Sequence, residues 1–423
     1  MDTVWQDRWQ ALTTQLAQMS ATYHQSSDPV NVSLHALTES LLAFGKDQFN
    51  FFWDGFKNKQ LLPSMVLPRK HVLRATLDQV AFDMAVIQRI SSQRSQAKLQ
   101  TAQELADKLA QRALNVAIEG KLLPKCSVLT YCNKSANIRI IPYAPIALIG
   151  IPFSATKVNR DFLAIPHEVG HYVYHHAPGL AAQLHDCIPL YPDWINHWLE
   201  EIFADVYAAF VAGPVCGLSL QGLLLDNSQE KFVADDGEHP PDAVRPCGIT
   251  EALRHLGDKQ AADGLEQLWL DQLATRHYPN EFTPYNSTTA ASFDQAKELI
   301  AQTAVLFLDC LENEWGLTRT TPPWTSGNKA DDTLFDSFDI FCDSLTVDPY
   351  YLKVEGENVG VYKPGNSLEN ARPLGSTQTW RDWIKKESRL QKEVLLPAQA
   401  WKPVFTAGYW PIKGPEGNSD GGI

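Results

Sequence analysis

Paired cysteine motifs and an excess of basic charge are both missing from this chain of 423 residues. Seven cysteines are scattered without C-x-x-C spacing, and an odd number cannot all pair, so we expect reduced thiols that mostly fill the core. The chain carries 36 lysine and arginine residues against 49 aspartate and glutamate residues, a formal net charge of −13. This balance argues against nucleic acid as a partner and disfavours an anionic membrane surface.

Targeting segments and long apolar runs are also scarce. The opening residues 1–7 have neither a basic nor an apolar region, so we expect no signal peptide and a cytoplasmic protein. Residues 206–225 contain no charged residue and are numerous enough to span a membrane. Gly213-Pro214 interrupts this stretch, and we interpret it as a buried helix with a break at that point.

Two histidines and a glutamate form the motif H-E-x-x-H at His167, Glu168 and His171. In a helix of 3.6 residues per turn, His167 and His171 lie about 40° apart around the axis, so both imidazoles leave one face and can bind one metal ion. Zinc is the expected ion. Glu168 follows the first histidine directly, where its carboxylate can take a proton from an attacking water. Pro166 suits the first turn of this helix.

A second helix is expected thirty residues later, with Glu201 and Asp205 four positions apart on one face. Glu201 can complete a site with His167 and His171, and Asp205, one turn further, can accept a hydrogen bond from a histidine ligand. Three protein ligands leave a fourth position open for water. Such an open site is typical of catalytic zinc, since structural sites are closed and usually rich in cysteine.

With both motifs in order, the sequence resembles the gluzincin metallopeptidases, in which H-E-x-x-H is followed by a helix carrying E-x-x-x-D. Residues 201–205 also fit the narrower E-x-x-A-D form. The resemblance implies a thermolysin-like catalytic domain and zinc-dependent endopeptidase activity on a peptide or protein substrate. Glu168 would be the general base, and His167, His171 and Glu201 would be the zinc ligands.

A third element is similar to the H-P-P-x-x-x-R segment of the CAAX prenyl proteases and the related bacterial heat-shock membrane proteases. It runs from His239 to Arg245. By this resemblance, His239 would donate to the developing oxyanion and Arg245 would fix the local carboxylates. The likeness covers roughly residues 138–256, and the chain departs from these membrane families in lacking clear spanning helices.

Methionine is absent after Met84, and this absence separates zinc peptidase classes. The metzincin pattern requires a Met-turn after the zinc helix, with glycine at the position of Tyr174 and histidine at that of Ala177. The G-x-M-x-N signature of gluzincin aminopeptidases is missing upstream of the zinc helix. An endopeptidase is therefore favoured over an aminopeptidase.

The overall pattern predicts an α+β protein that is mainly helical, with a small mixed sheet. Residues 1–120 read as a helical N-terminal region, 121–345 as the zinc peptidase domain, and 346–423 as an irregular, aromatic-rich C-terminal segment. Residues 126–131 and 138–153 read as two or three short strands. In gluzincins a strand before the zinc helix has an exposed edge to which a peptide can add. Residues 146–152 are the candidate, and an ordinary buried strand is the alternative.

Several polar groups have two interpretations each. His175, one turn beyond His171, is disfavoured as a further ligand because a helix diverges quickly from a point ligand. Residues 235–238 form either a second cation site, such as calcium, or a solvated loop. The basic patch of Arg69, Lys70, His71 and Arg74 is either the solvated start of a helix, which is favoured, or a binding site.

Three alternatives to the peptidase remain open at this point. The motif can be coincidental in a helical protein, although three elements in the right order argue against that. The chain can be a gluzincin-like module that binds a regulatory protein partner, with zinc in a structural role; Glu168 argues against this, since a structural site has no use for it. A zinc hydrolase of a non-peptide amide is the third.

Overall fold

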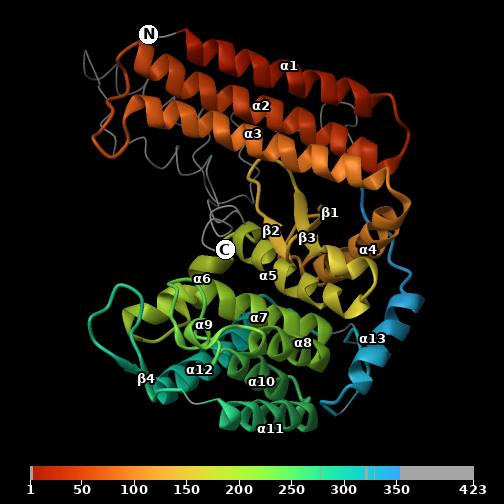
Figure 1. The fold of residues 1–423 in the computed structure, drawn as a ribbon, viewed down its shortest axis with the longest axis vertical. Helices are drawn as coiled ribbons and strands as arrows, with labels where there is room; N and C mark the ends of the chain where they lie inside the picture. Colours follow the sequence, from red (N-terminus) through yellow and green to blue (C-terminus); the bar gives the residue numbers. More distant parts are fainter. Residues whose placement is uncertain (1–2, 277, 320–322, 328, 353–423) are drawn as a thin grey trace.

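The computed structural model shows a mainly helical protein with a small mixed sheet, as the sequence predicts (Figure 1). The structure describes residues 3–276, 278–319, 323–327 and 329–352. Most of the predicted C-terminal segment, from residue 353 onward, lies outside the described residues.

The first four helices are α1 (Val4–His24), α2 (Pro29–Lys57), α3 (Arg69–Arg94) and α4 (Ala97–Glu119). The sheet strands are β1 (Ser127–Asn133), β2 (Asn137–Arg139) and β3 (Ile146–Pro152). The later helices are α5 (Ile165–His176), α6 (Leu180–Asp186), α7 (Leu199–Ala212), α8 (Pro214–Leu225), α9 (Gln229–Val233), α10 (Pro246–His255), α11 (Lys259–Thr275), α12 (Phe293–Asn313) and α13 (Thr333–Ser344). The short elements are the 3-10 turns η1 (Phe153–Thr156), η2 (Asn159–Ala164) and η3 (Asp193–His197), and the strand pair β4 (Glu281–Phe282) and β5 (Ala291–Ser292).

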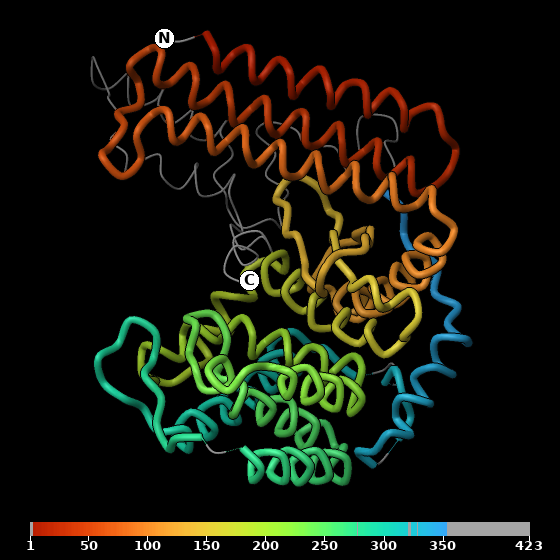
Figure 2. The backbone as a smooth tube through the Cα atoms, in the orientation of Figure 1, coloured from red at the N-terminus to blue at the C-terminus, as the bar shows by residue number. Residues whose placement is uncertain are grey.

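Helices α1, α2 and α3 form an antiparallel layer over the sheet (Figures 1 and 2). The side chain of Asp28 caps α2 by accepting a hydrogen bond from the Val30 amide, and Pro29 occupies the first turn, where its missing N–H is not needed. Apolar side chains at three- and four-residue spacing along α1 and α2 are buried in this layer.

The sheet has the order β1-β3-β2, with β1 parallel and β2 antiparallel to the central β3. Successive side chains of a strand point to opposite faces, and here both faces are covered. Leu129, Ile146 and Leu148 pack with the layer of α1, α2 and α3. Val128 and Ile149 pack into the larger core with α4, α5 and α7. The sheet is therefore the layer that joins the N-terminal helices to the half of the molecule that carries H-E-x-x-H.

The prediction that residues 146–152 present an exposed strand edge is wrong. These residues form β3, which has β1 on one side and β2 on the other and is buried along nearly its whole length. The local pattern predicts the strand, but strand order depends on where residues 137–139 return, which is not a local property. The boundary at residue 120 stays a prediction; the buried face of α4 packs in the larger core with the residues that follow it.

The uncharged stretch over residues 206–225 is divided into α7 and α8 at Gly213, as predicted. Gly213 has φ of +73°, and a Cβ there would lie 2.7 Å from the Pro323 Cβ, so glycine is required at this turn. Pro214 then begins α8. Across the described ranges, the structure contains no helix with enough length and apolar character to cross a membrane. The chain turns between α10 and α11 at Gly257, which has φ of +92°.

A buried ion pair ties the N-terminal helices to the sheet. Arg94, at the end of α3, donates to both carboxylate oxygens of Asp107 on α4, at 3.0 and 2.8 Å. Asp107 also accepts hydrogen bonds from the amide and hydroxyl of Thr130 on β1. Burial raises the pKa of Asp107, while Arg94 and Thr130 oppose that rise.

Removal of the Asp107 carboxylate tests this junction. We expect Asp107→Ala to lower the free energy of unfolding by about 3–5 kcal/mol, because Arg94 then stays largely buried without its counterion. Asp78→Ala is the matched control: its pair with Arg74 is exposed, so the expected loss is about 0–1 kcal/mol. Urea unfolding followed by tryptophan fluorescence measures both, and equal losses would contradict the assignment.

Candidate metal centre

Helices α5 and α7 carry the candidate ligands and lie against each other in opposite directions. His167, early in α5, faces Glu201 and Asp205 of α7, whereas His175, late in α5, faces Glu200. Gly170 makes the close approach possible: a Cβ at this position would lie 2.8 Å from the Cα of Ala204. The two backbones therefore touch at the level where the ligand side chains meet.

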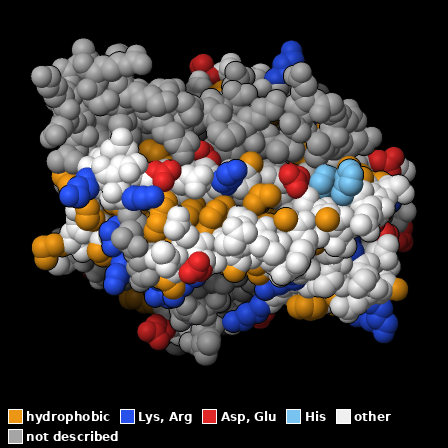
Figure 3. Space-filling view, turned by 90° about the horizontal axis from the view of Figure 1, so that it is seen from above, with side chains coloured by type: hydrophobic (Ala, Val, Ile, Leu, Met, Phe, Trp, Pro, Cys, Tyr) orange, Lys and Arg blue, Asp and Glu red, His pale blue; other side chains and the backbone are white. Residues whose placement is uncertain are grey.

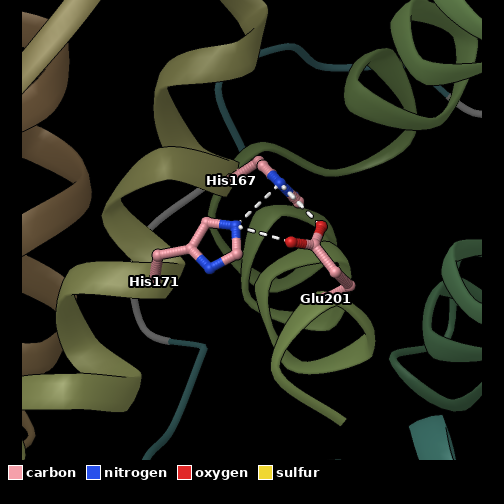
Figure 4. Close-up of side chains that lie close together, drawn as sticks. All are labelled: His167, His171 and Glu201. Atoms are coloured by element: carbon pink, nitrogen blue, oxygen red, sulfur yellow. Dashed lines mark hydrogen bonds and ion pairs between the residues drawn. The ribbon is translucent and has the colours of Figure 1, made fainter. Parts of the chain in front are cut away.

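Three side-chain atoms converge between these helices (Figure 4). The Nε2 atoms of His167 and His171 are 3.1 Å apart. His167 Nε2 lies 3.5 Å from Glu201 Oε2, and His171 Nε2 lies 3.5 Å from the other oxygen, Oε1. Ligands held at about 2.0–2.1 Å around a tetrahedral zinc ion lie about 3.3 Å from one another. One donor atom from each residue lies within 4.8 Å of the other two, and the shortest separations are close to the spacing around a tetrahedral ion.

The other ring nitrogens of the two histidines face carboxylates. His167 Nδ1 lies 2.9 Å from Asp205 Oδ1, close in distance although not aligned as a hydrogen bond. His171 Nδ1 is hydrogen-bonded to Glu200 Oε1 at 3.0 Å. The same Glu200 oxygen lies 2.7 Å from His175 Nε2. Carboxylates behind the rings leave each Nε2 free to bind a cation, the usual arrangement around metal-binding histidines.

Arg245 holds the two carboxylates of α7 in place. Its Nε and Nη2 donate to Asp205 at 2.8 and 3.0 Å, and Nη2 also donates to Glu201 Oε2 at 3.1 Å. The guanidinium is buried, so it compensates negative charge that water does not reach. The position of Arg245 therefore fits the carboxylate-fixing role that the resemblance implies.

His239 reaches the same cluster from the loop before α10. Its Nε2 lies 3.5 Å from Glu201 Oε1, and its Nδ1 is hydrogen-bonded to Asp236 Oδ2 at 2.8 Å. The side chain is about one-third exposed, in contrast to the buried Arg245. His239 thus lies at the open side of the cluster.

Glu168 is buried next to the histidines, with 8% of its surface exposed. Burial raises the pKa of its carboxyl group, and the neighbouring His167 and His171 partly oppose that rise. A carboxylate whose pKa is raised toward neutrality is a better proton acceptor than a solvated one.

The cluster is built to stabilise a positive charge between its carboxylates. Burial alone would lower the pKa of His167, but Asp205 and Glu201 outweigh it and raise that pKa to about 10. Burial would raise the pKa of Glu201, yet the charges of His239, His171 and Arg245 hold it well below its usual range. The negative charge of Glu201 and Asp205, which favours a proton on His167, would also favour a metal cation at this place.

No known protein family, curated protein or solved structure matches the chain. The resemblance to gluzincins therefore depends on the quoted motifs alone. What the structure adds is the convergence of those motifs, which are up to 78 positions apart between His167 and Arg245, at one place.

Glu200 is the residue of this cluster that the sequence reasoning missed. Its position one before Glu201 gives no local signal, because its role depends on the angle at which α7 crosses α5. The carboxylates of residues 235–238 do not form a second centre. Asp235 accepts from Trp198 Nε1 and two backbone amides, and Asp236 from His239. His167, His171 and Glu201 are the one group with metal-ligand spacing in the part of the chain that the structure describes.

A methyl group at position 170 should disturb the centre without removing a ligand. We expect Gly170→Ala to push α5 away from α7 and to lower the free energy of unfolding by about 1–3 kcal/mol. Zinc binding should weaken by about tenfold or more, the loss typical when residues that position a metal ligand are disturbed. Gly222→Ala is the control, since the added Cβ on α8 meets nothing within 4 Å. Zinc titration against a chelator and thermal unfolding measure both variants; unchanged zinc affinity in Gly170→Ala would show that the close approach is unimportant.

Zinc affinity should increase with pH. At neutral pH the metal-free site holds a proton on His167, whose pKa is about 10, whereas a metal ligand must be the neutral imidazole. Binding therefore releases that proton, and we expect about a tenfold gain in affinity per pH unit below this pKa for each proton displaced. Competition with a chelator of known pH dependence measures the slope, and a flat profile would contradict the protonation assigned to His167.

Proposed function

We propose that this protein is a zinc-dependent endopeptidase of the gluzincin type. The observation that carries the proposal is the spacing of 3.1–3.5 Å among the Nε2 atoms of His167 and His171 and the Glu201 carboxylate, with Glu168 buried beside them. The convergence of two motifs from separate helices within 4.8 Å supports the proposal over a coincidental motif.

Two histidines and one carboxylate are the donor set of catalytic zinc sites that keep one position open. Soft thiolate ligands are absent from this group, and hard cations such as calcium prefer oxygen ligands alone, so zinc is the favoured ion. Zinc bound here would polarise the scissile carbonyl and lower the pKa of a water molecule toward about 7. His167, His171 and Glu201 would hold it.

Glu168 is the proposed general base. It follows His167 directly in α5, about 100° further around the helix axis. Its buried carboxylate feels the charges of His167 and His171 but is not one of the three grouped ligands. It would accept a proton from the attacking water and return that proton to the leaving amine. A purely structural site would gain nothing from a buried carboxylate at this point, because burial of an ionisable group is costly.

His239 and Arg245 have different proposed roles. The exposed edge of His239, hydrogen-bonded to Asp236, supports a role as donor to the negative charge that develops on the substrate oxygen. Burial would lower the pKa of His239, but Glu201 and Asp236 raise it, which favours the charged, donating imidazole. Arg245 keeps Glu201 and Asp205 oriented and does not reach the open side.

Replacement of Glu168 separates metal binding from turnover. We expect Glu168→Gln to retain one zinc ion per chain and to lose cleavage of unfolded casein and of a peptide library, because the amide cannot accept a proton. His167→Ala should lose both zinc and cleavage. Metal content by mass spectrometry and product analysis of the same preparations give the readouts.

The control is Glu266→Gln, on α11, whose carboxylate pairs with Arg254 and Lys297 outside the cluster; it should change neither property. Zinc-free His167→Ala protein with full cleavage would overturn the proposal. Zinc in wild type and in Glu168→Gln, with cleavage by neither, would instead favour the partner-binding module.

A further inference from the structure

The loop between α2 and α3 presents apolar side chains to solvent. Met65 is 99% exposed and Val66 84% exposed, the most exposed pair of consecutive large apolar residues in the described chain. Both lie in a turn closed by the hydrogen bonds from the Ser64 amide to the Leu67 carbonyl and from the Leu67 amide to the Ser64 hydroxyl. The turn therefore holds Met65 and Val66 at its apex, where they cannot reach the core.

Basic residues flank this apex on both sides in the sequence. Between Asp54 and Arg74 the chain has five lysine or arginine residues, at positions 57, 59, 69, 70 and 74, and one acidic residue, Asp54, so the local balance is +4 in a chain of −13. Arg74 is paired with the exposed Asp78, whereas Lys59, Arg69 and Lys70 line the edge of a pocket.

The pocket is lined by residues from both sides of this turn and has a volume of about 660 Å³. Its lining combines apolar and basic side chains: Phe56, Lys59, Leu61, Leu62, Pro63, Pro68, Arg69 and Lys70. In Figure 3, lysine and arginine side chains gather with apolar ones at the left end of the N-terminal helices, where this loop lies in Figure 1. We call residues 56–70 the tip.

We propose that the tip binds the surface of anionic phospholipid bilayers. Met65 and Val66 would enter the interface, and the surrounding lysine and arginine side chains would contact the anionic headgroups, the combination by which peripheral proteins attach to such surfaces. A protein partner is less well matched, because the most exposed apolar side chains, Met65 and Val66, are not the aromatic anchors that dominate protein recognition.

The tip is also placed where a membrane can reach it. It lies at one end of the layer of α1, α2 and α3, whereas α5 and α7 lie on the other side of the sheet (Figure 1). Attachment there would leave the metal centre accessible. This inference does not depend on the proposed peptidase activity.

Sedimentation of the full chain with lipid vesicles tests the proposal. We expect binding to phosphatidylcholine vesicles that contain phosphatidylserine, little binding to phosphatidylcholine alone, and a loss of binding at high salt, since the attraction of exposed charges is screened. Lys59→Glu with Lys70→Glu should weaken binding by about 25-fold or more, at about fivefold for each charge removed. Met65→Ser with Val66→Ser should weaken it by about tenfold or more through lost apolar burial.

Lys98→Glu with Lys231→Glu is the matched control, because both lysines are exposed outside the tip and the change in net charge is the same. It should retain most of the binding, and thermal unfolding should be unchanged in all three variants. Equal binding by the control and the tip variants, or no binding to anionic vesicles, would overturn the proposal. Binding to soluble polyglutamate that is as tight and does not need Met65 and Val66 would assign an acidic protein partner instead.

Discussion

The close approach of α5 and α7 at Gly170 and Ala204 is the constraint on which the site depends. Imidazole and carboxylate side chains are short, so two helices can share one cation only if their backbones come nearer than larger residues permit. Here the Cβ that Gly170 lacks would lie 2.8 Å from Ala204 Cα. The sheet and α4 pack against α5 on the side away from α7, and α12 packs against α7. The core therefore holds the two helices in contact.

That constraint forces several charges into a small buried volume. Glu201, Asp205 and Arg245 are all less than 10% exposed, and each would be costly if it were buried alone. Arg245 contacts both carboxylates and thereby offsets part of the cost, while the histidine rings provide the rest of the positive field. What remains is a strongly acidic pair of side chains facing two imidazoles, an arrangement that a cation stabilises. Stability and metal affinity are therefore linked at this centre.

The sequence predicts those parts of the site whose geometry is local. The spacing of His167 and His171, and that of Glu201 and Asp205, follows from 3.6 residues per turn, and the structure brings both pairs together. Glu200 could not be found in this way, because its contact with His171 depends on the crossing of two helices. The central position of β3 escaped prediction for the same reason: strand order is a long-range property.

Net charge averages over distances that solvent screens, so it does not describe the charge of any one patch of the surface. At physiological salt a charge is felt over about 8 Å, so a surface partner responds to the groups within that radius and not to the total of −13. Lys59, Arg69 and Lys70 lie around one pocket, and the apolar apex stands beside them. An anionic bilayer repels the acidic remainder of the surface. This repulsion disfavours orientations in which that surface faces the bilayer, and it favours the orientation in which the tip meets the membrane first.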